Sequence, residues 1–349
     1  MAREKVNIGV IGAGWWASQS HIPALLANPH VGIIAVNRPD EEGLATVSKA
    51  FNLTHAYRDA AEMLDKEDLA GVVIASPHVL HAEHARLAIA RGLNILIEKP
   101  MTTTTADARD LVALAKAKGT SIMMPYGWNY TALTDTAHRL IKAGWVGEVR
   151  HVVAQMASAL TDLFAGEPML ETKDHLFRPP ASTWADPKRS GGYGWGQLTH
   201  GLGALFRIID LEPARAFARM GMSPAGVDFY DAAVVEFANG ATMALSGSAT
   251  VPKARGFQVD IRIFGTEGML LFDIERARVE AIRHDGKIYA DPLPTGAGDY
   301  ETVAPINRFV DLCRGEKIVN PADGVIGARA VALLDTLYRS AKSGRMEEV

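Results

Sequence analysis

The chain has 349 residues, a length that favours about two domains. Its composition, 48% hydrophobic and 22% charged, is typical of a globular protein and excludes a disordered chain. Lys and Arg number 36 and Asp and Glu 40, and the resulting net charge of −4 argues against nucleic acid or an anionic membrane as a partner. Cys313 is the one cysteine, and no apolar run reaches the ~20 residues that span a bilayer. With no signal-peptide pattern at its start, we expect a reduced, cytoplasmic protein.

The first 125 residues alternate short apolar runs with helical patterns. The run Val6–Ile11 ends in a glycine loop, and similar runs occupy residues 31–36, 71–75 and 94–97. Because these runs lack polar alternation and helices separate them, they predict a doubly wound parallel sheet covered on both faces. We therefore expect an α/β Rossmann domain over residues 1–125.

From about residue 147 the chain becomes β-rich, with frequent alternation of polar and apolar residues. Turn signals such as Asn239-Gly240 separate the segments 148–157, 232–237, 242–248 and 257–264. This pattern predicts an open, mainly antiparallel sheet. Helical patterns return at 307–313 and 322–340. We expect an α+β substrate and oligomerisation domain over residues 126–349, whose last helices can pack back on the first domain.

The glycine loop after the first strand is a candidate dinucleotide site. Gly12 and Gly14 allow a tight turn and a close approach to a pyrophosphate at a helix N-terminus, although Ala17 stands at the third small position of G-x-G-x-x-G. Trp15 and Trp16 follow directly, so we expect one of them against the cofactor and the other in packing.

The second strand ends in Asn37-Arg38, where a carboxylate would hold the ribose of NAD. Arg38 can pair with a 2′-phosphate, which favours NADP. In the alternative, Arg38 stacks on the adenine and Asn37 bonds the ribose, which permits NAD.

Two later strand ends carry a family resemblance. The segments Ser76-Pro77-His78-Val79-Leu80-His81 and Glu98-Lys99-Pro100, together with Gly12-Ala13-Gly14, resemble the Gfo/Idh/MocA oxidoreductase family. The resemblance continues through 143–149 and reaches 340–345. It implies a Rossmann domain with an open-faced α+β domain, a sugar or polyol substrate held against the nicotinamide, and a homodimer or homotetramer. It also implies cofactor contacts from Ser76, Pro77, His81, Glu98 and Lys99.

Lys99 and His200 are the candidate catalytic residues. Lys99 comes just after a parallel strand, at the edge where such sheets bind ligands, and a buried cation there can donate to a reacting oxygen. An isolated Lys at a strand end would otherwise be a surface residue. Residues 191–200 resemble the glycine-rich segment of the family that ends in a histidine, and His200 suits proton transfer because imidazole titrates near neutrality. Its alternative is a histidine of the core.

The sequence departs from the family pattern at Gly196. Many family dehydrogenases carry an Asp there, four residues before the histidine, and Gln197 cannot accept a proton at neutral pH. Either Lys99 and His200 suffice, or the reaction is not a plain alcohol oxidation. Residues 199–203 partly resemble the NAD-dependent glycoside hydrolases, which oxidise a ring hydroxyl transiently, eliminate the aglycone, add water and return the hydride.

Candidate substrate contacts gather at residues 124–130, after the strand that follows 94–97, and in the glycine-rich segment. Aromatic faces suit sugar rings and amides suit hydroxyls, although two or three of these aromatics can equally belong to the core. The set is Tyr126, Trp128, Asn129, Tyr193, Gln197 and His200. A long polar loop at 173–189 is of the kind that covers sites. His78, His81 and His84 have no carboxylate or cysteine to complete a ligand set, so we expect no metal.

The leading hypothesis is an NAD(P)-dependent dehydrogenase acting on a hydroxyl of a sugar, polyol or glycoside. The alternative on the same scaffold is a redox-assisted glycosidase that uses its cofactor without consuming it. A dinucleotide-sensing binding protein without turnover is the third hypothesis, and it predicts loss of Lys99 or His200, which are both present.

Overall fold

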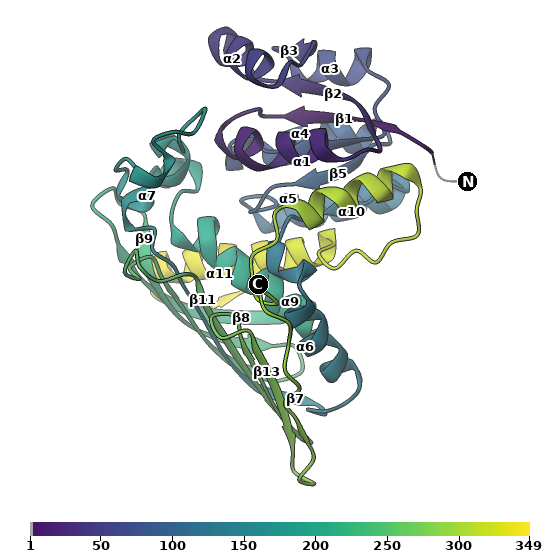
Figure 1. Ribbon diagram of the computed structural model, residues 1–349. Helices are drawn as coiled ribbons and strands as arrows, with labels where there is room; N and C mark the ends of the chain where they lie inside the picture. The colour runs from purple at the N-terminus through teal and green to yellow at the C-terminus, as the bar shows by residue number, and fades with distance from the viewer. Residues whose placement is uncertain (1–2) are drawn as a thin grey trace. The chain divides into compact units, whose positions relative to one another are not determined.

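The computed structural model describes residues 3–349 and divides into two compact units (Figure 1). Within the described residues, unit 1 comprises 3–125, 169–183 and 302–328. Unit 2 comprises residues 126–168, 184–301 and 329–349. Each unit is built around one sheet, so the fold is α/β followed by α+β, as the sequence predicts.

The sheet of unit 1 has six parallel strands in the order β3-β2-β1-β4-β5-β6. This is the doubly wound order, in which the chain starts at the centre and moves first to one edge and then to the other. The strands are β1 (Val6–Ile11), β2 (Val31–Asn37), β3 (His55–Tyr57), β4 (Gly71–Ile74), β5 (Asn94–Ile97) and β6 (Ile122–Met123). Every residue of β4 is buried, which explains its lack of polar alternation.

Helices cover this sheet, and their ends follow local sequence signals. Asp40 caps α2 (Glu41–Phe51) by accepting from the amide of Gly43 at 2.6 Å, and Thr104 caps α5 (Thr105–Lys118) in the same way. The helix after β1 contains a π-turn, η1 (Ala17–His21), before α1 (Ile22–Ala27). The other helical elements between the strands are α3 (Ala60–Lys66), η2 (His78–Leu80) and α4 (His81–Ala90).

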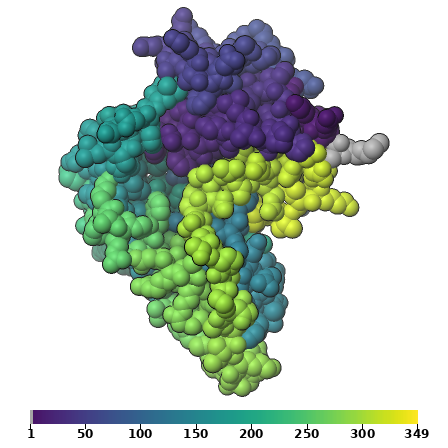
Figure 2. All heavy atoms as spheres, in the orientation of Figure 1, coloured from purple at the N-terminus to yellow at the C-terminus, as the bar shows by residue number. Residues whose placement is uncertain are grey.

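Two segments from later in the chain also belong to unit 1. Helix α10 (Val303–Arg314) packs against α1 and β5, and in Figure 2 its yellow-green atoms lie beside the purple atoms of the first helix. Phe309 and Val310 of α10 are fully buried there. The second segment, residues 169–183, contains η4 (Leu170–Thr172) and reaches the glycine loop described below.

The sheet of unit 2 has nine strands in the order β14-β13-β12-β11-β7-β10-β9-β8-β15. Its pairs are antiparallel except for β7 with β10, which run parallel, so the sheet is mixed and mostly antiparallel. The strands are β7 (Val149–Ala157), β8 (Pro213–Met222), β9 (Asp228–Phe237), β10 (Thr242–Ser248), β11 (Gln258–Gly265), β12 (Gly268–Asp273), β13 (Arg278–Arg283), β14 (Ile288–Tyr289) and β15 (Glu347–Glu348).

One face of this sheet is packed and the other is open. Helices α6 (Ala132–Lys142) and α9 (Thr199–Ile208) lie against one face of the sheet (Figure 1). The strands alternate buried and exposed residues, as expected when one face is covered. No helix within residues 3–349 covers the opposite face. The shorter helical elements are η3 (Gly127–Tyr130), α7 (Thr161–Ala165), α8 (Ala181–Trp184), η5 (Pro187–Arg189) and the π-turn η6 (Gly194–Leu198).

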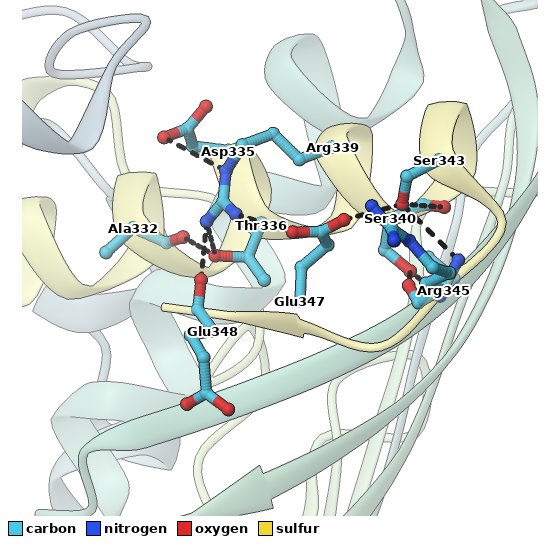
Figure 3. Close-up of polar contacts among 10 residues, drawn as sticks. Ala332, Asp335, Thr336, Arg339, Ser340, Ser343, Arg345, Glu347 and Glu348 are labelled. Atoms are coloured by element: carbon cyan, nitrogen blue, oxygen red, sulfur yellow. Dashed lines mark hydrogen bonds and ion pairs between the residues drawn. The ribbon is translucent and has the colours of Figure 1, made fainter.

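The C-terminus closes one edge of the nine-stranded sheet. After α11 (Gly324–Ser343), strand β15 pairs with β8. Arg339 holds this strand by donating to the carbonyl of Glu348 at 2.6 Å, and Ser340 donates to the carbonyl of Arg345 at 2.5 Å (Figure 3). The pairing covers Arg215 and Ala216 at the start of β8, so β15 becomes the last strand at this edge of the sheet.

The helices of residues 3–349 include none that could cross a membrane. None of them combines the length and the apolar character that crossing a bilayer requires.

Candidate active site

The glycine loop of unit 1 has the backbone that a pyrophosphate requires. Gly12 has φ = +86°, and a Cβ atom there would lie 2.4 Å from the amide nitrogen of Ser76 at the end of β4. Only glycine fits this position, because any side chain would be strained in φ and would overlap a neighbouring backbone. The amide of Gly14 donates to the carbonyl of Gly12 at 2.7 Å, and a helix begins directly afterwards. The loop therefore fits a dinucleotide phosphate at a helix N-terminus.

The end of β2 places Asn37 and Arg38 beside this loop. The carbonyl of Asn37 accepts from the amides of Gly12 and Ala13, and its buried side chain donates to the carbonyl of Tyr57 at 3.3 Å. The guanidinium of Arg38 donates to Ala13 O at 3.1 Å and to a carboxylate oxygen of Asp40 at 2.5 Å. Arg38 is thus fixed at the strand end where the adenosine of a dinucleotide would lie.

The segment 169–183 contacts the same region through two side chains. His175 accepts at Nδ1 from Nε1 of Trp15 at 2.9 Å, and the two rings are stacked. The Phe177 ring lies under the Arg38 guanidinium, with 4.2 Å between its centroid and Cζ, a cation–π contact. Trp15 also packs edge-on against Trp16. The loop that the sequence predicts to cover a site therefore contacts Trp15 and Arg38, beside the glycine loop, through His175 and Phe177, which the sequence did not single out.

His81 joins the ends of β4 and β5. Its Nε2 lies 2.7 Å from the carbonyl of Ser76 and its Nδ1 2.7 Å from the carbonyl of Pro100, and the Lys99–Pro100 peptide bond is cis. Burial lowers the pKa of His81, although both carbonyls act in the opposite direction. Since the ring has no exposed surface, His81 can act on a cofactor only through the loops that it connects.

Lys99 lies just past β5 and is 9% exposed. Burial lowers its pKa to about 8, while the charge of Glu98 acts in the opposite direction. Burial by itself would raise the pKa of Glu98, but the hydrogen bond from His21 and the nearby charges lower it overall. The structure thus presents a carboxylate beside a lysine that titrates near neutral pH, an arrangement frequent at functional sites.

In unit 2, His200 is the second residue of α9 and lies within a group of aromatic rings. Tyr126, Trp128 and Tyr300 all meet its imidazole edge to face, with ring centroids 6.0, 5.9 and 5.2 Å away. The hydroxyl of Tyr300 lies 3.2 Å from Nδ1 of His200. The indole N–H of Trp128 is buried and has no hydrogen-bond acceptor among residues 3–349. An unsatisfied buried donor next to an imidazole is suited to a polar ligand.

Two of the predicted substrate residues also hold the group together. Tyr126 shares a hydrogen bond with Thr199 Oγ1 at 3.0 Å, and Asn129 donates to the carbonyl of Gly203 at 3.0 Å. A Cβ at Gly203 would lie 2.6 Å from the Tyr126 ring, so this glycine lets the ring pack against α9. These contacts fix the aromatic residues relative to His200.

The side chains of Tyr193 and Gln197, in the glycine-rich segment before α9, are buried in unit 2. Tyr193 has no exposed surface, and its hydroxyl donates to the carbonyl of Met156 at 3.1 Å. Burial raises the pKa of this phenol. Gln197 is buried within the π-turn η6. Tyr193 therefore lies in the core of unit 2, at a position that supports the sheet rather than an accessible binding surface.

A buried pair of acids supports the same segment. Asp228 accepts from the amide of Gly194 at 2.7 Å and from the hydroxyl of Tyr338 at 2.6 Å. Asp231 lies beside Asp228 and is 4% exposed. Burial, and then the charge of Asp228, raise the pKa of Asp231 well above its ordinary value.

Two family models match the chain. Residues 6–126 match the NAD-binding Rossmann fold of the GFO/IDH/MocA oxidoreductase family, and residues 134–271 match the GFO/IDH/MocA C-terminal domain. The two matches fall in the two halves of the chain that carry the two sheets.

Known proteins are similar to this chain at low identity. D-xylose 1-dehydrogenase (NADP(+)) 2 of Haloferax volcanii is 23% identical over 344 residues, which are 98% of this chain and 99% of that protein. A dTDP-3,4-didehydro-2,6-dideoxy-alpha-D-glucose 3-reductase of Streptomyces antibioticus is 32% identical over 154 residues, and the matched region is only 44% of this chain and 47% of that protein. The solved structure of a levoglucosan dehydrogenase in complex with NADH superposes with a TM-score of 0.77 at 20% identity, covering 99% of each chain.

Proposed function

Because this chain belongs to the Gfo/Idh/MocA family of NAD(P)-dependent oxidoreductases, we propose that it transfers a hydride between the nicotinamide and a secondary or ring hydroxyl of a sugar, polyol or glycoside. The observation that carries this proposal is Lys99. It is a buried lysine with a pKa of about 8, two positions after a parallel strand whose neighbour ends against the glycine loop. This is the edge at which doubly wound sheets bind their ligands.

The two candidate catalytic residues have complementary tasks. When bound, the nicotinamide supplies the hydride acceptor in one direction and the donor in the other. The protonated Lys99 donates a hydrogen bond to the substrate oxygen and stabilises the negative charge that develops there. The imidazole of His200 takes the hydroxyl proton in oxidation and returns it in reduction.

The aromatic group around His200 supports a carbohydrate substrate. Trp128 is buried beside His200, and its indole N–H has no partner among residues 3–349, which suits a hydroxyl of a sugar that reaches this group. The similar proteins include a xylose dehydrogenase, a reductase of a nucleotide-linked deoxysugar and a levoglucosan dehydrogenase. Which sugar or polyol is used, and which carbon reacts, depends on loop contacts.

For the cofactor, we propose a preference for NADP. Arg38 supplies a fixed guanidinium at the end of β2, and a guanidinium pairs well with phosphate oxygens. The neighbouring Asp40 is the competing feature, since its carboxylate would repel a 2′-phosphate and suits the ribose hydroxyls of NAD. The relative affinity for the two dinucleotides distinguishes these roles.

A redox-assisted glycosidase is the second candidate, and Gly196 favours it. The residue provides no carboxylate four positions before His200, so a plain alcohol oxidation lacks one member of the usual acid–base set. In this reaction the hydride would return to the substrate after the aglycone has left and water has been added. The cofactor would then be required without being consumed.

We also propose that a second copy of this chain covers the open face of the nine-stranded sheet. Val153 on β7 and Val234 on β9 are 36% and 50% exposed, and both lie opposite Ala244 of β10 in register. An apolar row across an uncovered sheet face is typical of a surface that another molecule covers.

The function is tested by incubating the purified protein with NAD or NADP and a panel of free sugars, polyols and chromogenic glycosides. Reduced cofactor and released aglycone are measured in the same wells. Reduction with a free sugar or polyol supports the dehydrogenase, and cofactor-dependent aglycone release without net reduction supports the glycosidase.

A further inference from the structure

Aromatic rings occupy the space that a side chain at position 196 would need. A Cβ at Gly196 would lie 2.9 Å from two ring atoms of Phe164 and 3.2 Å from the ring of Trp184. Phe164 itself is fully buried, so it cannot simply turn aside. An aspartate at 196 is therefore incompatible with this packing, and the partner of His200 must come from elsewhere.

The hydroxyl of Tyr300 lies within hydrogen-bond distance of the His200 imidazole. The hydroxyl oxygen lies 3.2 Å from Nδ1, and the two rings meet at 87° with centroids 5.2 Å apart. The same ring packs at 89° against Trp128. The tyrosine therefore contacts both the imidazole and its neighbouring indole.

The loop that carries Tyr300 is held in place by specific contacts. A Cβ at Gly127 would lie 2.8 Å from the Tyr300 ring and 2.3 Å from the carbonyl of Glu301, so a glycine is needed where the ring packs. Three residues earlier in the loop, the carbonyl of Ala297 accepts from the amide of Leu133 at 3.4 Å. These contacts position the hydroxyl of Tyr300 beside the imidazole of His200.

We infer that Tyr300 is the positioning residue of His200, an inference that rests on the proposed role of His200 in proton transfer. The phenol oxygen accepts the Nδ1–H of the imidazole, which leaves the lone pair on Nε2. In oxidation the substrate O–H bond would break and an Nε2–H bond would form, and a bound nicotinamide would supply the acceptor for the hydride that leaves the carbon. Tyr300 keeps its own proton throughout, and Nδ1 keeps the same hydrogen bond in the neutral and the protonated ring.

The tautomer of His200 tests this inference without any substrate. Protein labelled with ¹⁵N-histidine is measured by long-range ¹H–¹⁵N NMR at a pH where the ring is neutral, and the His200→Asn variant assigns the signals. The expected result for the wild type is a proton on Nδ1. In Tyr300→Phe, which keeps the ring packing and removes only the hydroxyl, the signal moves towards the Nε2–H form that free imidazole prefers.

Tyr126→Phe is the matched control. It also removes a hydroxyl from a ring that touches His200, but that hydroxyl bonds Thr199 Oγ1 instead of the imidazole. The His200 tautomer is expected to stay unchanged in this variant. A wild-type His200 with its proton on Nε2 overturns the inference, whether or not the Phe variant folds. An unchanged tautomer in a folded Tyr300→Phe protein overturns it as well.

Kinetics provide a second readout once a substrate is found. Tyr300→Phe is expected to lower kcat about 10- to 100-fold with little change in KM for the cofactor, because orientation of the base and not binding is lost. If the tautomer result holds while no sugar, polyol or glycoside reacts, the proposed function fails and the pairing of Tyr300 with His200 stands. A Tyr300→Phe variant with a raised KM and an unchanged kcat contradicts the positioning role.

Discussion

Nε2 of His21 lies 2.9 Å from Oε1 of Glu98, although 77 positions separate the two residues in the sequence. His21 ends the π-turn that follows the glycine loop, and Glu98 directly follows β5. The other carboxylate oxygen of Glu98 accepts from the amide of Lys99 at 3.1 Å. This contact joins the helix at the phosphate end of the cofactor site to the loop that carries the proposed catalytic lysine.

Lys99→Ala tests the role of the lysine. Because the ammonium group is proposed to stabilise charge on the reacting oxygen, turnover should fall by about 10³-fold or more while the dissociation constant of the cofactor changes little. Stopped-assay turnover and cofactor fluorescence titration measure the two effects. Lys116→Ala, at an exposed position of α5, is the control and should behave as the wild type. Retention of half the activity in Lys99→Ala contradicts the role.

The pH profile should reflect the environment of Lys99. In the proposed role the protonated amine is the active form, and its pKa is about 8, so kcat/KM should decline as the pH rises through about 8. Glu98 raises the pKa of Lys99, and Glu98→Gln should therefore move this alkaline decline to lower pH. The measurement is kcat/KM between pH 6 and pH 10, with Glu42→Gln, an exposed change on α2, as control. If the alkaline decline of kcat/KM lies at the same pH in Glu98→Gln as in the wild type, the decline belongs to a group other than Lys99.

Arg38→Ala tests the preference between the two dinucleotides. Loss of a guanidinium that pairs with a 2′-phosphate should raise the dissociation constant of NADP by about 10-fold or more, since a charge-assisted contact contributes about 1.5–3 kcal/mol. The dissociation constant of NAD should rise by much less. Dissociation constants from fluorescence titration give the comparison. Arg86→Ala, which removes an arginine paired with Asp107 and Asp110, should affect neither cofactor. Equal losses for NAD and NADP contradict the proposed preference.

Asp231→Asn should stabilise the protein at neutral pH. Burial raises the pKa of Asp231 in the folded state above that in the unfolded chain, so the folded state binds more protons and stability falls as pH rises above about 4. Asparagine cannot ionise, and the variant should gain about 1–3 kcal/mol at pH 7 and almost nothing near pH 4. Urea unfolding at both pH values measures this.

Asp228→Asn is the comparison for that variant. Asp228 accepts hydrogen bonds from Gly194 and Tyr338, so its replacement removes an acceptor that is in use and should give no gain. A destabilised Asp231→Asn protein at pH 7 would show that the Asp231 carboxylate carries a charge that the fold needs.

Val234→Glu tests the proposed cover of the open sheet face. A charge at the centre of an apolar interface should shift the protein from a dimer or tetramer towards a monomer, since unpaired buried charge is costly. Light scattering after size-exclusion chromatography measures the mass. Val319→Glu, a change at another exposed valine, in unit 1, should leave the mass unchanged. A wild-type protein that is already monomeric at micromolar concentration contradicts the proposal.

The elements that a continuous apolar run forms, and that a glycine or a charged residue ends, were predictable from the sequence. The strands 6–11 and 94–97 have the predicted bounds, because their apolar runs stop at a glycine and at a charged pair. The glycine loop was predictable for the same reason, since Gly12 follows a strand and precedes a helix. The parallel pairing of β7 with β10 within a mostly antiparallel sheet was not predictable. The alternation of polar and apolar residues shows which face of a strand is buried, but it does not show which strand lies next to it.

The contacts that complete the candidate site depend on chain segments that meet only in the fold. Tyr300 lies in a loop one hundred positions after His200, with no periodic pattern to distinguish it from other surface tyrosines. His175 and Phe177 occur in a polar loop, and their contacts with Trp15 and Arg38 follow from the fold of unit 1. His21 was expected to cap or pack, and its hydrogen bond to Glu98 needed the sheet order to become visible.

The most direct test of the account is the combined measurement of cofactor reduction and aglycone release over the panel of sugars, polyols and chromogenic glycosides. The account predicts that NADP, and less readily NAD, is reduced in stoichiometric amounts by at least one free sugar or polyol, and that Lys99→Ala abolishes the signal. Release of aglycone that requires the cofactor but leaves it unreduced would contradict the dehydrogenase and identify the redox-assisted glycosidase instead.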